Sequence, residues 1–263
     1  MSPATPEPFA LSTPHAVARQ RALRLAAASK PYVARGAGLV RCSGCRLPET
    51  HCICALRPVV PSNAGFCLLL GDIEALKPTN TGWLIADVVP DTWAFGWSRT
   101  EVDPALLALL ANPQWRPHVV FPTEYAAPSR AVTAPVTDDG RRPLFVLLDG
   151  TWSEARKMFR KSPWLDSSPV LGLQPAHASR YRLRRSAQDH HFCTAEVAAM
   201  CLDLAGDAAA AEALDAWFGL FSERYLSARG HQPLSAGSEA EQRVRALTSA
   251  WGPVQPGMSG STS

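Results

Sequence analysis

The segment LFVLLDGTWSEARKMFR, residues 144–160, is the part of the sequence that decides the expected fold. It begins with an unbroken apolar run that ends at Asp149, and such a run is typical of a buried strand. Thr151 and Glu154 then have the spacing of a capping box, which predicts that a helix starts at Trp152. The segment therefore predicts a strand, an Asp-Gly turn and a helix, with Asp149 at the carboxyl end of the strand.

The same alternation of strands and helices continues along most of the chain. Short apolar runs bounded by turn residues predict strands at 65–71, 93–97, 118–121, 144–148 and 169–173, with helices at 81–89 and 104–111 and a helical region at 193–227. This alternation indicates an α/β domain with a mostly parallel sheet. In such sheets, ligands bind in a crevice at the carboxyl ends of the strands, where Asp149 is expected. An Asp-Gly turn can equally be a simple strand ending.

The 263 residues are enough for one large domain with attached segments. Composition divides the chain into four parts. We expect a disordered, Pro/Ser/Thr-rich start, a basic helix with a cysteine-rich unit, the α/β domain, and a flexible Gly/Ser/Pro-rich tail, at residues 1–12, 13–60, 61–230 and 231–263.

The amino-terminal region carries a local positive charge, although the net charge of the chain is only +3. No acidic residue occurs between Glu7 and Glu49. Thr13 and Pro14 predict the cap and first position of a helix that runs towards Ser29. A basic helix suits a polyanionic partner such as RNA, and further basic groups occur at 156–161 and 180–185. Each group alone is also typical of a solvated face. The candidate RNA-contacting residues of the helix are Arg19, Arg21 and Arg24.

Four of the seven cysteines lie within thirteen positions, as a CxxC pair followed by a CxC pair. Four thiolates at this spacing are the usual ligands of a structural zinc ion, and a closed shell of four leaves no position open for catalysis. Cysteines used in this way indicate a reducing compartment, so we expect a cytoplasmic protein. No apolar run is long enough to span a membrane. The expected ligands are Cys42, Cys45, Cys52 and Cys54, whereas Cys67, Cys193 and Cys201 are expected in the core.

Six short motifs occur together in one order. They are the CxxC and CxC pairs, KPTNTG at 77–82, FPTEYA at 121–126, DGTW at 149–152, YRLR at 181–184 and CTAEV at 193–197. Over roughly residues 15–230 the chain resembles the DTW-domain tRNA-uridine aminocarboxypropyltransferases, most closely the bacterial enzymes that modify the variable loop. Asp91, Thr92 and Trp93 also spell DTW, but they follow a proline and lead into a strand, so we interpret that triplet as a coincidence.

The resemblance implies a SPOUT-like α/β fold for residues 61–230, with a trefoil knot in its carboxyl half that binds S-adenosylmethionine. It also implies the reaction. The 3-amino-3-carboxypropyl group of S-adenosylmethionine would pass to N3 of a tRNA uridine, expected to be uridine 47 of the variable loop, and methylthioadenosine would leave. N3 is free only in an unpaired base, and exposed loop bases are what proteins read best in RNA.

Particular residues receive roles from this resemblance and from their positions. Asp149 is the candidate general base for the N3 proton, or else it positions the base, and Thr151 and Trp152 complete the catalytic group. Trp152 would stack on the uridine or on the cofactor adenine, although it also suits a core residue. The expected cofactor contacts are Lys77, Thr79, Asn80, Thr81, Pro122, Leu148, Thr151, Trp152, Thr194 and Glu196. The expected RNA contacts are Arg19, Arg21, Arg24, Tyr181, Arg182 and Arg184.

Two other functions remain open from the sequence. A SPOUT-type RNA methyltransferase would share the fold and the cofactor, and it would differ only in which carbon of the sulfonium faces the base. A non-catalytic zinc-knuckle RNA-binding protein would use the basic groups, and in it Asp149 would be only a turn residue. For the second alternative, helix capping would also explain Thr194 and Glu196.

Overall fold

The computed structural model describes residues 14–30, 32–33, 38–173, 192–233 and 237–251. In these residues a single six-stranded sheet forms the centre of the molecule, and every pair of neighbouring strands is parallel. The strand order is β2-β1-β5-β3-β6-β4. The strands are β1 (Gly65–Leu70), β2 (Thr92–Gly96), β3 (Trp115–Val120), β4 (Ala131–Val132), β5 (Arg142–Asp149) and β6 (Val170–Leu171). The predicted α/β class with a mostly parallel sheet is confirmed.

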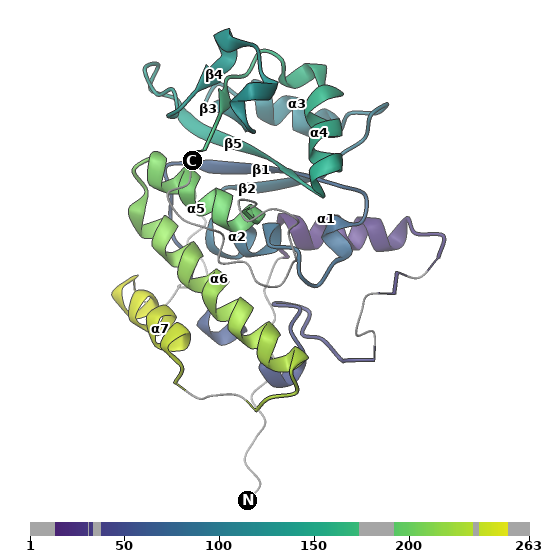
Figure 1. Cartoon of the computed structure of the whole chain (residues 1–263), viewed down its shortest axis with the longest axis vertical. Helices are drawn as coiled ribbons and strands as arrows, with labels where there is room; N and C mark the ends of the chain where they lie inside the picture. The colour runs from purple at the N-terminus through teal and green to yellow at the C-terminus, as the bar shows by residue number, and fades with distance from the viewer. Residues whose placement is uncertain (1–13, 31, 34–37, 174–191, 234–236, 252–263) are drawn as a thin grey trace, which may run out of the picture.

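Helices cover both faces of the sheet, as Figure 1 shows. One face packs against α1 (Ala16–Ala26), α2 (Gly82–Val88), α5 (Thr194–Leu204) and α6 (Ala208–Arg229). The opposite face packs against α3 (Pro104–Ala111) and α4 (Trp152–Arg160). A further helix, α7 (Glu239–Trp251), lies along α6. The short 3-10 turns are η1 (Glu49–His51), η2 (Cys54–Leu56), η3 (Glu74–Leu76), η4 (Thr123–Tyr125), η5 (Pro128–Arg130) and η6 (Pro163–Leu165).

The central strands are apolar along their whole length because both of their faces are covered. In β1, Phe66 and Leu68 face the layer that contains α2 and α5, whereas Cys67 and Leu69 face the layer that contains α4. All four side chains are fully buried. Continuous burial of this kind is what makes parallel strands readable as unbroken apolar runs.

The strand boundaries differ from the prediction where the sequence pattern is weak. β3 begins at Trp115, three residues before the expected start, and it pairs with β5 even through Pro117. The two-residue strand β4 was not predicted, since two residues show no periodicity. The strand expected at 169–173 is reduced to β6. The helical region at 193–227 forms two helices because the chain turns at Gly206, which has a φ of +78°.

The first helix also differs from its predicted boundaries. The first helix starts at Ala16 and ends at Ala26, so the cap at Thr13 and the extension to Ser29 were wrong. His15 is the cap, and its ring Nδ1 accepts a hydrogen bond from the backbone N–H of Ala18 at 3.2 Å.

At the other end, part of the expected flexible tail is helix α7. Its Val244 is buried in the core that α6 shares, and this packing keeps the helix in place. The predicted disordered start, residues 1–12, lies outside the described residues. None of the helices in the described ranges combines the length and apolar character needed to cross a membrane.

A buried polar cluster joins α1 to the rest of the fold. The carboxylate of Asp87, on α2, lies 3.6 Å from Nε2 of His15 and accepts hydrogen bonds from Arg57 (3.3 Å) and from the indole of Trp217 (3.1 Å). Burial raises the pKa of Asp87 to about 6. Burial, followed by the charges of Arg46, Arg57 and Arg19, lowers the pKa of His15 to about 3. The neighbouring carboxylate alone would favour a charged imidazole, but burial and three arginines outweigh it.

The low pKa of His15 predicts how the stability of the protein depends on pH. Between about pH 3 and pH 6.5 the unfolded chain holds a proton on His15 that the folded chain does not. The free energy of unfolding therefore falls as the pH falls from 6.5 towards 3. Asp87 acts in the opposite direction between about pH 4 and pH 6, so wild type must be compared with a variant that retains Asp87. His15→Asn can still cap α1.

Between pH 6.5 and about pH 3 we expect the unfolding free energy of wild type to fall relative to that of His15→Asn, on the order of 1 kcal/mol for each pH unit. Urea denaturation of both proteins at neutral pH and in mild acid measures this difference. A difference that is independent of pH would show that His15 titrates normally in the folded protein.

Candidate functional site

Asp149 lies at the carboxyl edge of the sheet, where β1 and β5 end side by side. These strands are neighbours, and Leu70 pairs with Asp149 at their last positions. After β1 the chain continues to α2 on one face of the sheet, whereas after β5 it continues to α4 on the other. Neighbouring parallel strands whose connections leave to opposite faces open the crevice in which α/β proteins bind ligands. Asp149 is therefore at the predicted strand end and at the switch point.

The side chain of Asp149 is buried, with 1% of the residue exposed. Its Oδ2 accepts a hydrogen bond from the amide Nδ2 of Asn80 at 2.6 Å. Its Oδ1 accepts one from the hydroxyl of Thr194 at 2.7 Å. A buried carboxylate needs such partners, because leaving water without them is very costly. Asp149 thus ties together the end of β5, the loop before α2 and the first residue of α5.

The loop at 77–82 is held from several sides. The Asn80 side chain also accepts a hydrogen bond from the backbone N–H of Trp83 at 3.0 Å, which caps α2. The Thr81 hydroxyl accepts one from the backbone N–H of Ala195 at 3.4 Å. Lys77 pairs with the fully buried carboxylate of Glu74. Asn80, Thr81 and Thr194, three predicted cofactor contacts, therefore lie next to Asp149 or are linked to its partners.

The predicted capping box is present at the start of α4. The backbone N–H and the hydroxyl of Thr151 both donate to Glu154, at 2.7 and 2.6 Å, and the helix begins at Trp152 as predicted. Burial of Glu154 opposes ionisation, but the hydrogen bonds from Thr151 outweigh it and hold the pKa of Glu154 below its ordinary value. The negative charge at this position also suits the positive end of the helix dipole.

Trp152 is part of an aromatic cluster at the same edge of the sheet. Its ring stacks on Phe121, which follows β3, with a centroid distance of 5.3 Å and an interplanar angle of 11°. Tyr125 contacts Trp152 edge-on at 5.8 Å, and the guanidinium of Arg156 lies 5.3 Å from the Tyr125 ring centroid. Trp152 is 41% exposed and Tyr125 is 39% exposed. Trp152 is therefore packed against two aromatic rings and still partly exposed.

A cavity of about 610 Å³ lies between α1, α4 and the ends of β1 and β2. Arg24 from α1 and Lys157 from α4 both line it, so the basic amino-terminal helix and the helix that follows DGTW face one cavity. Arg24 donates to the backbone carbonyl of Asp72 at 2.9 Å and pairs with its carboxylate. Asp149 and Trp152 do not line this cavity.

The remaining predicted residues occupy several positions. Glu196 accepts a hydrogen bond from the backbone N–H of Cys193 at 2.8 Å, so its described contact caps α5. Arg19 is exposed on α1 and donates to the carbonyl of Pro14, whereas Arg21 is half-buried. Pro122, Leu148 and Thr79 are half-buried. The predicted RNA contacts Tyr181, Arg182 and Arg184 lie outside the described residues.

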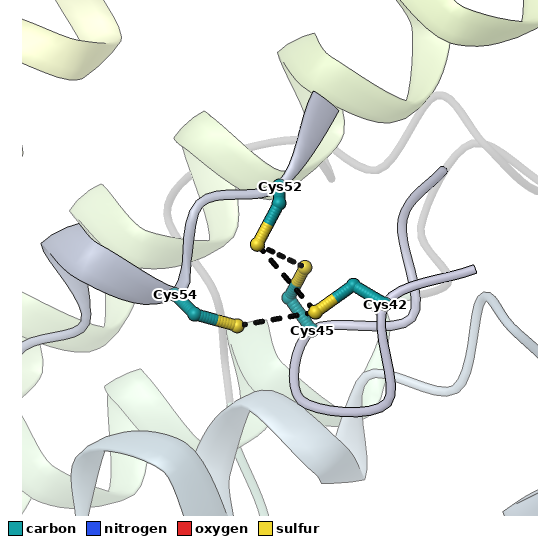
Figure 2. Close-up of side chains that lie close together, drawn as sticks. All are labelled: Cys42, Cys45, Cys52 and Cys54. Carbon is teal, nitrogen blue, oxygen red and sulfur yellow. Dashed lines mark hydrogen bonds between the residues drawn. The ribbon is translucent and has the colours of Figure 1, made fainter. Parts of the chain in front are cut away.

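The four predicted ligand cysteines meet at one point. Figure 2 shows their sulfur atoms directed towards a common centre. Cys42 and Cys54 are 3.5 Å apart at Sγ, Cys42 and Cys52 also 3.5 Å, and Cys45 and Cys52 3.9 Å. All four atoms lie within 4.8 Å of one another. The other three cysteines are buried in the core, as predicted.

These distances fit a tetrahedral zinc site. Sulfurs bonded to zinc at about 2.3 Å would be separated by about 3.8 Å. Hydrogen bonds from the thiols of Cys45 and then Cys54 lower the pKa of Cys52, whereas the hydrogen bonds within the cluster raise the pKa of Cys45 and of Cys54, so without a metal the four thiols share their protons unequally. A divalent cation would stabilise thiolates that otherwise repel one another. The four side chains can hold zinc, and a site closed by four cysteines has a structural role.

The fold and these two centres define an α/β protein with a buried carboxylate at the switch point of its sheet and four cysteines that could hold a metal ion. Residues 39–226 match the DTW domain. The match covers most of the chain, so the protein belongs to the DTW-domain family, which is associated with tRNA modification. No solved structure matches the chain significantly. DGTW at 149–152 is at the site, whereas Asp91 is at the amino end of β2, paired with Arg142 at 2.5 Å.

The contacts of several important residues could not be predicted from the sequence. Phe121 and Tyr125 belong to a motif, but nothing indicated that they would pack around Trp152. Gly82 was counted only as a motif residue, yet a Cβ there would lie 2.7 Å from Oδ2 of Asp149. Arg46 was counted only as one basic residue among many, although it is buried beneath the loop at 77–82. Such contacts depend on the folded chain and have no local pattern.

The close approach at Gly82 leads to a prediction about stability. Gly82→Ala should destabilise the protein by about 1–3 kcal/mol, because the new methyl group collides with a carboxylate that is fixed by two hydrogen bonds. Gly219→Ala is the matched control, since no atom lies within 4 Å of the added Cβ in α6. It should stabilise the helix by about 0.5–1 kcal/mol. Chemical denaturation measures the change in unfolding free energy of both variants. If the two changes had the same sign, the close packing at Gly82 would be contradicted.

The four-cysteine site leads to a second prediction. The purified protein should contain one zinc ion per chain, and Cys42→Ala should lose it, because three thiolates bind zinc much less tightly than four. Cys201→Ala removes a fully buried thiol from the core, so it should lower stability and leave the zinc content unchanged. Elemental analysis of the three proteins is the measurement. Full zinc occupancy in Cys42→Ala would remove Cys42 from the ligand set.

Proposed function

We propose that this protein transfers the 3-amino-3-carboxypropyl group of S-adenosylmethionine to N3 of a tRNA uridine, uridine 47 of the variable loop. The observation that carries the proposal is the convergence of three motifs on one carboxylate. Asp149 of DGTW binds Asn80 of KPTNTG and Thr194 of CTAEV, although 69 and 45 residues separate them in sequence. A SPOUT-like knotted topology, which binds S-adenosylmethionine at the knot, is part of the proposal.

The reaction is a nucleophilic substitution at the γ-carbon of the amino-acid arm. The N3 nitrogen forms a bond to that carbon, the carbon–sulfur bond breaks, and its electron pair returns to sulfur, which loses its positive charge. Methylthioadenosine leaves, and the N3 proton is released. The protein must hold N3, the γ-carbon and the sulfur in line, since correct orientation of two reactants contributes much of the rate of such a step.

Asp149 is better suited to positioning than to accepting the proton. Both of its oxygens already accept hydrogen bonds, and the residue is almost fully buried. A proton acceptor must come within hydrogen-bond reach of the group it deprotonates. We therefore assign to Asp149 the role of fixing the loop at 77–82 against α5, and the N3 proton passes to water. The negative charge of Asp149 also stabilises a cationic sulfonium held nearby.

The aromatic cluster supports binding of a flipped base or of adenine. Trp152 stacks on Phe121 and is 41% exposed, and Tyr125 beside it is 39% exposed. Aromatic rings that are held rigidly from behind are the usual platforms on which proteins stack unpaired bases. Arg156, over Tyr125, adds a positive charge for the adjoining phosphate.

The distribution of positive charge supports tRNA as the partner. Arg24 of α1 and Lys157 of α4 face one cavity at the carboxyl edge of the sheet, and Arg19 is exposed on α1. Phosphate contacts fix the orientation of a nucleic acid and do not read its sequence. In this proposal α1 and α4 hold the tRNA backbone, and the aromatic cluster receives the base.

The experiment that tests the reaction is mass spectrometry of nucleosides from tRNA incubated with the protein and S-adenosylmethionine. We expect a uridine that carries an aminocarboxypropyl group, with methylthioadenosine as the co-product. A methylated base with S-adenosylhomocysteine would instead show a methyltransferase. An unmodified tRNA that still binds the protein would indicate a non-catalytic RNA-binding protein.

Asp149→Asn should lower the rate of transfer by about 10²-fold, the loss that accompanies a misplacement of about 1 Å. The new side chain can keep its oxygen towards Asn80, but its NH2 group then faces the Thr194 hydroxyl, which must turn to accept, and the charge is removed. Because the hydrogen bond to Asn80 loses its charge assistance, the loop at 77–82 is held less firmly, and the affinity for S-adenosylmethionine should fall as well. Single-turnover kinetics and calorimetry measure the two effects.

The control for this prediction is Asp91→Asn. Asp91 belongs to the other DTW triplet, at the opposite edge of the sheet, and its carboxylate contacts Arg142. Transfer should be unchanged in this variant. Wild-type turnover in Asp149→Asn would remove Asp149 from the site, and lost transfer in folded Asp91→Asn would show that the wrong triplet was chosen.

A further inference from the structure

Arg46 connects the four-cysteine cluster to the candidate site. It directly follows the ligand Cys45, and its backbone N–H donates to the carbonyl of Cys42 at 2.9 Å, inside the cluster. Its guanidinium extends away from the sulfurs and donates to the carbonyl of Lys77 at 2.5 Å and to that of Asn80 at 2.8 Å. A planar guanidinium can hold two carbonyls at once, which an ammonium cannot do in the same geometry.

The backbone at Arg46 is held in an unusual conformation. Its φ is +63°, in the left-handed region that residues with a side chain seldom adopt, and the residue is only 5% exposed. Strain of this kind persists only where the surrounding structure enforces it. In this protein, the turn between Cys42 and Cys45 enforces it and directs the side chain under the loop at 77–82. Closure of the cysteine cluster therefore sets the direction of Arg46.

A second contact runs parallel to the first. The indole N–H of Trp83, one residue after Gly82, donates to the carbonyl of Gly44 at 2.8 Å. The guanidinium of Arg46 lies over the Trp83 ring, 4.0 Å from its centroid. A cation buried against an indole in this way adds further attraction. Gly44 itself is packed on the cluster, since a Cβ there would lie 2.7 Å from Sγ of Cys54.

These contacts form a continuous path from the cysteines to Asp149. Arg46 holds the carbonyl of Asn80, and the amide of Asn80 holds the carboxylate of Asp149 at 2.6 Å. Each step is a hydrogen bond between buried groups, in which a small displacement loses the bond.

We propose that the four-cysteine cluster, when it holds its metal, positions the S-adenosylmethionine-binding loop at 77–82 through Arg46, and so couples metal binding to cofactor binding. Arg46 is a positioning residue in this scheme and does not touch the reacting atoms. The proposal rests on the proposed function in identifying the ligand of the loop. Its structural part, that Arg46 anchors the loop, is independent of the reaction.

The first experiment measures the loop directly. In Arg46→Met, hydrogen exchange at the amides of residues 77–83 and 194–197 should be about ten- to a hundredfold faster than in wild type, because two hydrogen bonds to a charged group are lost. Arg57→Met is the matched control. It removes a nearby arginine that binds Asp87, so it lowers stability without touching the loop. Unchanged exchange at 77–83 in Arg46→Met, or an equal increase in Arg57→Met, would overturn the proposal.

The second experiment uses the reciprocity of coupled binding. If zinc strengthens S-adenosylmethionine binding, S-adenosylmethionine must strengthen zinc binding by the same factor. Competition with a chromogenic chelator at equilibrium should show a higher zinc affinity of the wild-type protein in the presence of S-adenosylmethionine, by about five- to a hundredfold. In Arg46→Met, which keeps all four cysteines, zinc should still bind and the enhancement should disappear. Equal zinc affinities with and without S-adenosylmethionine in wild type would overturn the coupling.

The two experiments separate the coupling from the reaction. If calorimetry shows that S-adenosylmethionine does not bind, the proposed function fails, and the exchange measurement still decides whether Arg46 anchors the loop. If S-adenosylmethionine binds and Arg46→Met raises KM for it while kcat stays within about twofold, the residue acts through the cofactor loop. A fall in kcat with an unchanged KM would contradict this assignment.

Discussion

The arrangement of the site depends on a buried carboxylate and on its need for partners. Asp149 is 1% exposed at the end of a central strand, where water does not satisfy it. Unpaired, it would destabilise the fold strongly, so the segments that supply Asn80 and Thr194 must dock against the sheet edge. The same requirement explains why Gly82 has no side chain: any Cβ would occupy the space of the carboxylate. A group needed for stability is thereby also the group that joins the loop at 77–82 and α5 to the end of β5.

The sequence predicted what is local and missed what is assembled over distance. The strand ending at Asp149, the capping box of Thr151 and Glu154 and the cysteine spacing follow short-range rules, and the structure contains all three. The partners of Asp149 could be named only as members of motifs, because no periodic pattern tells which side chains will share a hydrogen bond. The cap at His15 was missed since histidine is an uncommon cap, and its ring also packs edge-on against Trp83 at 4.4 Å.

The structure revised the expected chemical role of Asp149 more than it revised the expected fold. A carboxylate at a strand end, near an expected base with an acidic N–H, suggests a proton acceptor. Burial and two short hydrogen bonds favour a positioning role, and neither could be read before the loop at 77–82 and α5 were placed in space. Arg46 is the converse case, because among many basic residues nothing marked it as the one that turns inward. Its partners are two backbone carbonyls, which any sequence could supply.

The order of the six strands has a consequence for how the protein comes to be active during synthesis. The sheet is completed by residues up to Leu171, whereas the backbone N–H that binds the Thr81 hydroxyl belongs to Ala195, which lies 114 residues after Thr81. Contacts this distant along a chain form slowly, and parallel strands add to the delay. A nascent chain that ends before α5 contains all six strands but lacks α5 and α6, which cover one face of the sheet, and it leaves Asp149 without Thr194. Chains that stop short of α5 therefore expose apolar strand residues together with a carboxylate that has lost one partner, so the sheet edge is completed only after α5 leaves the ribosome.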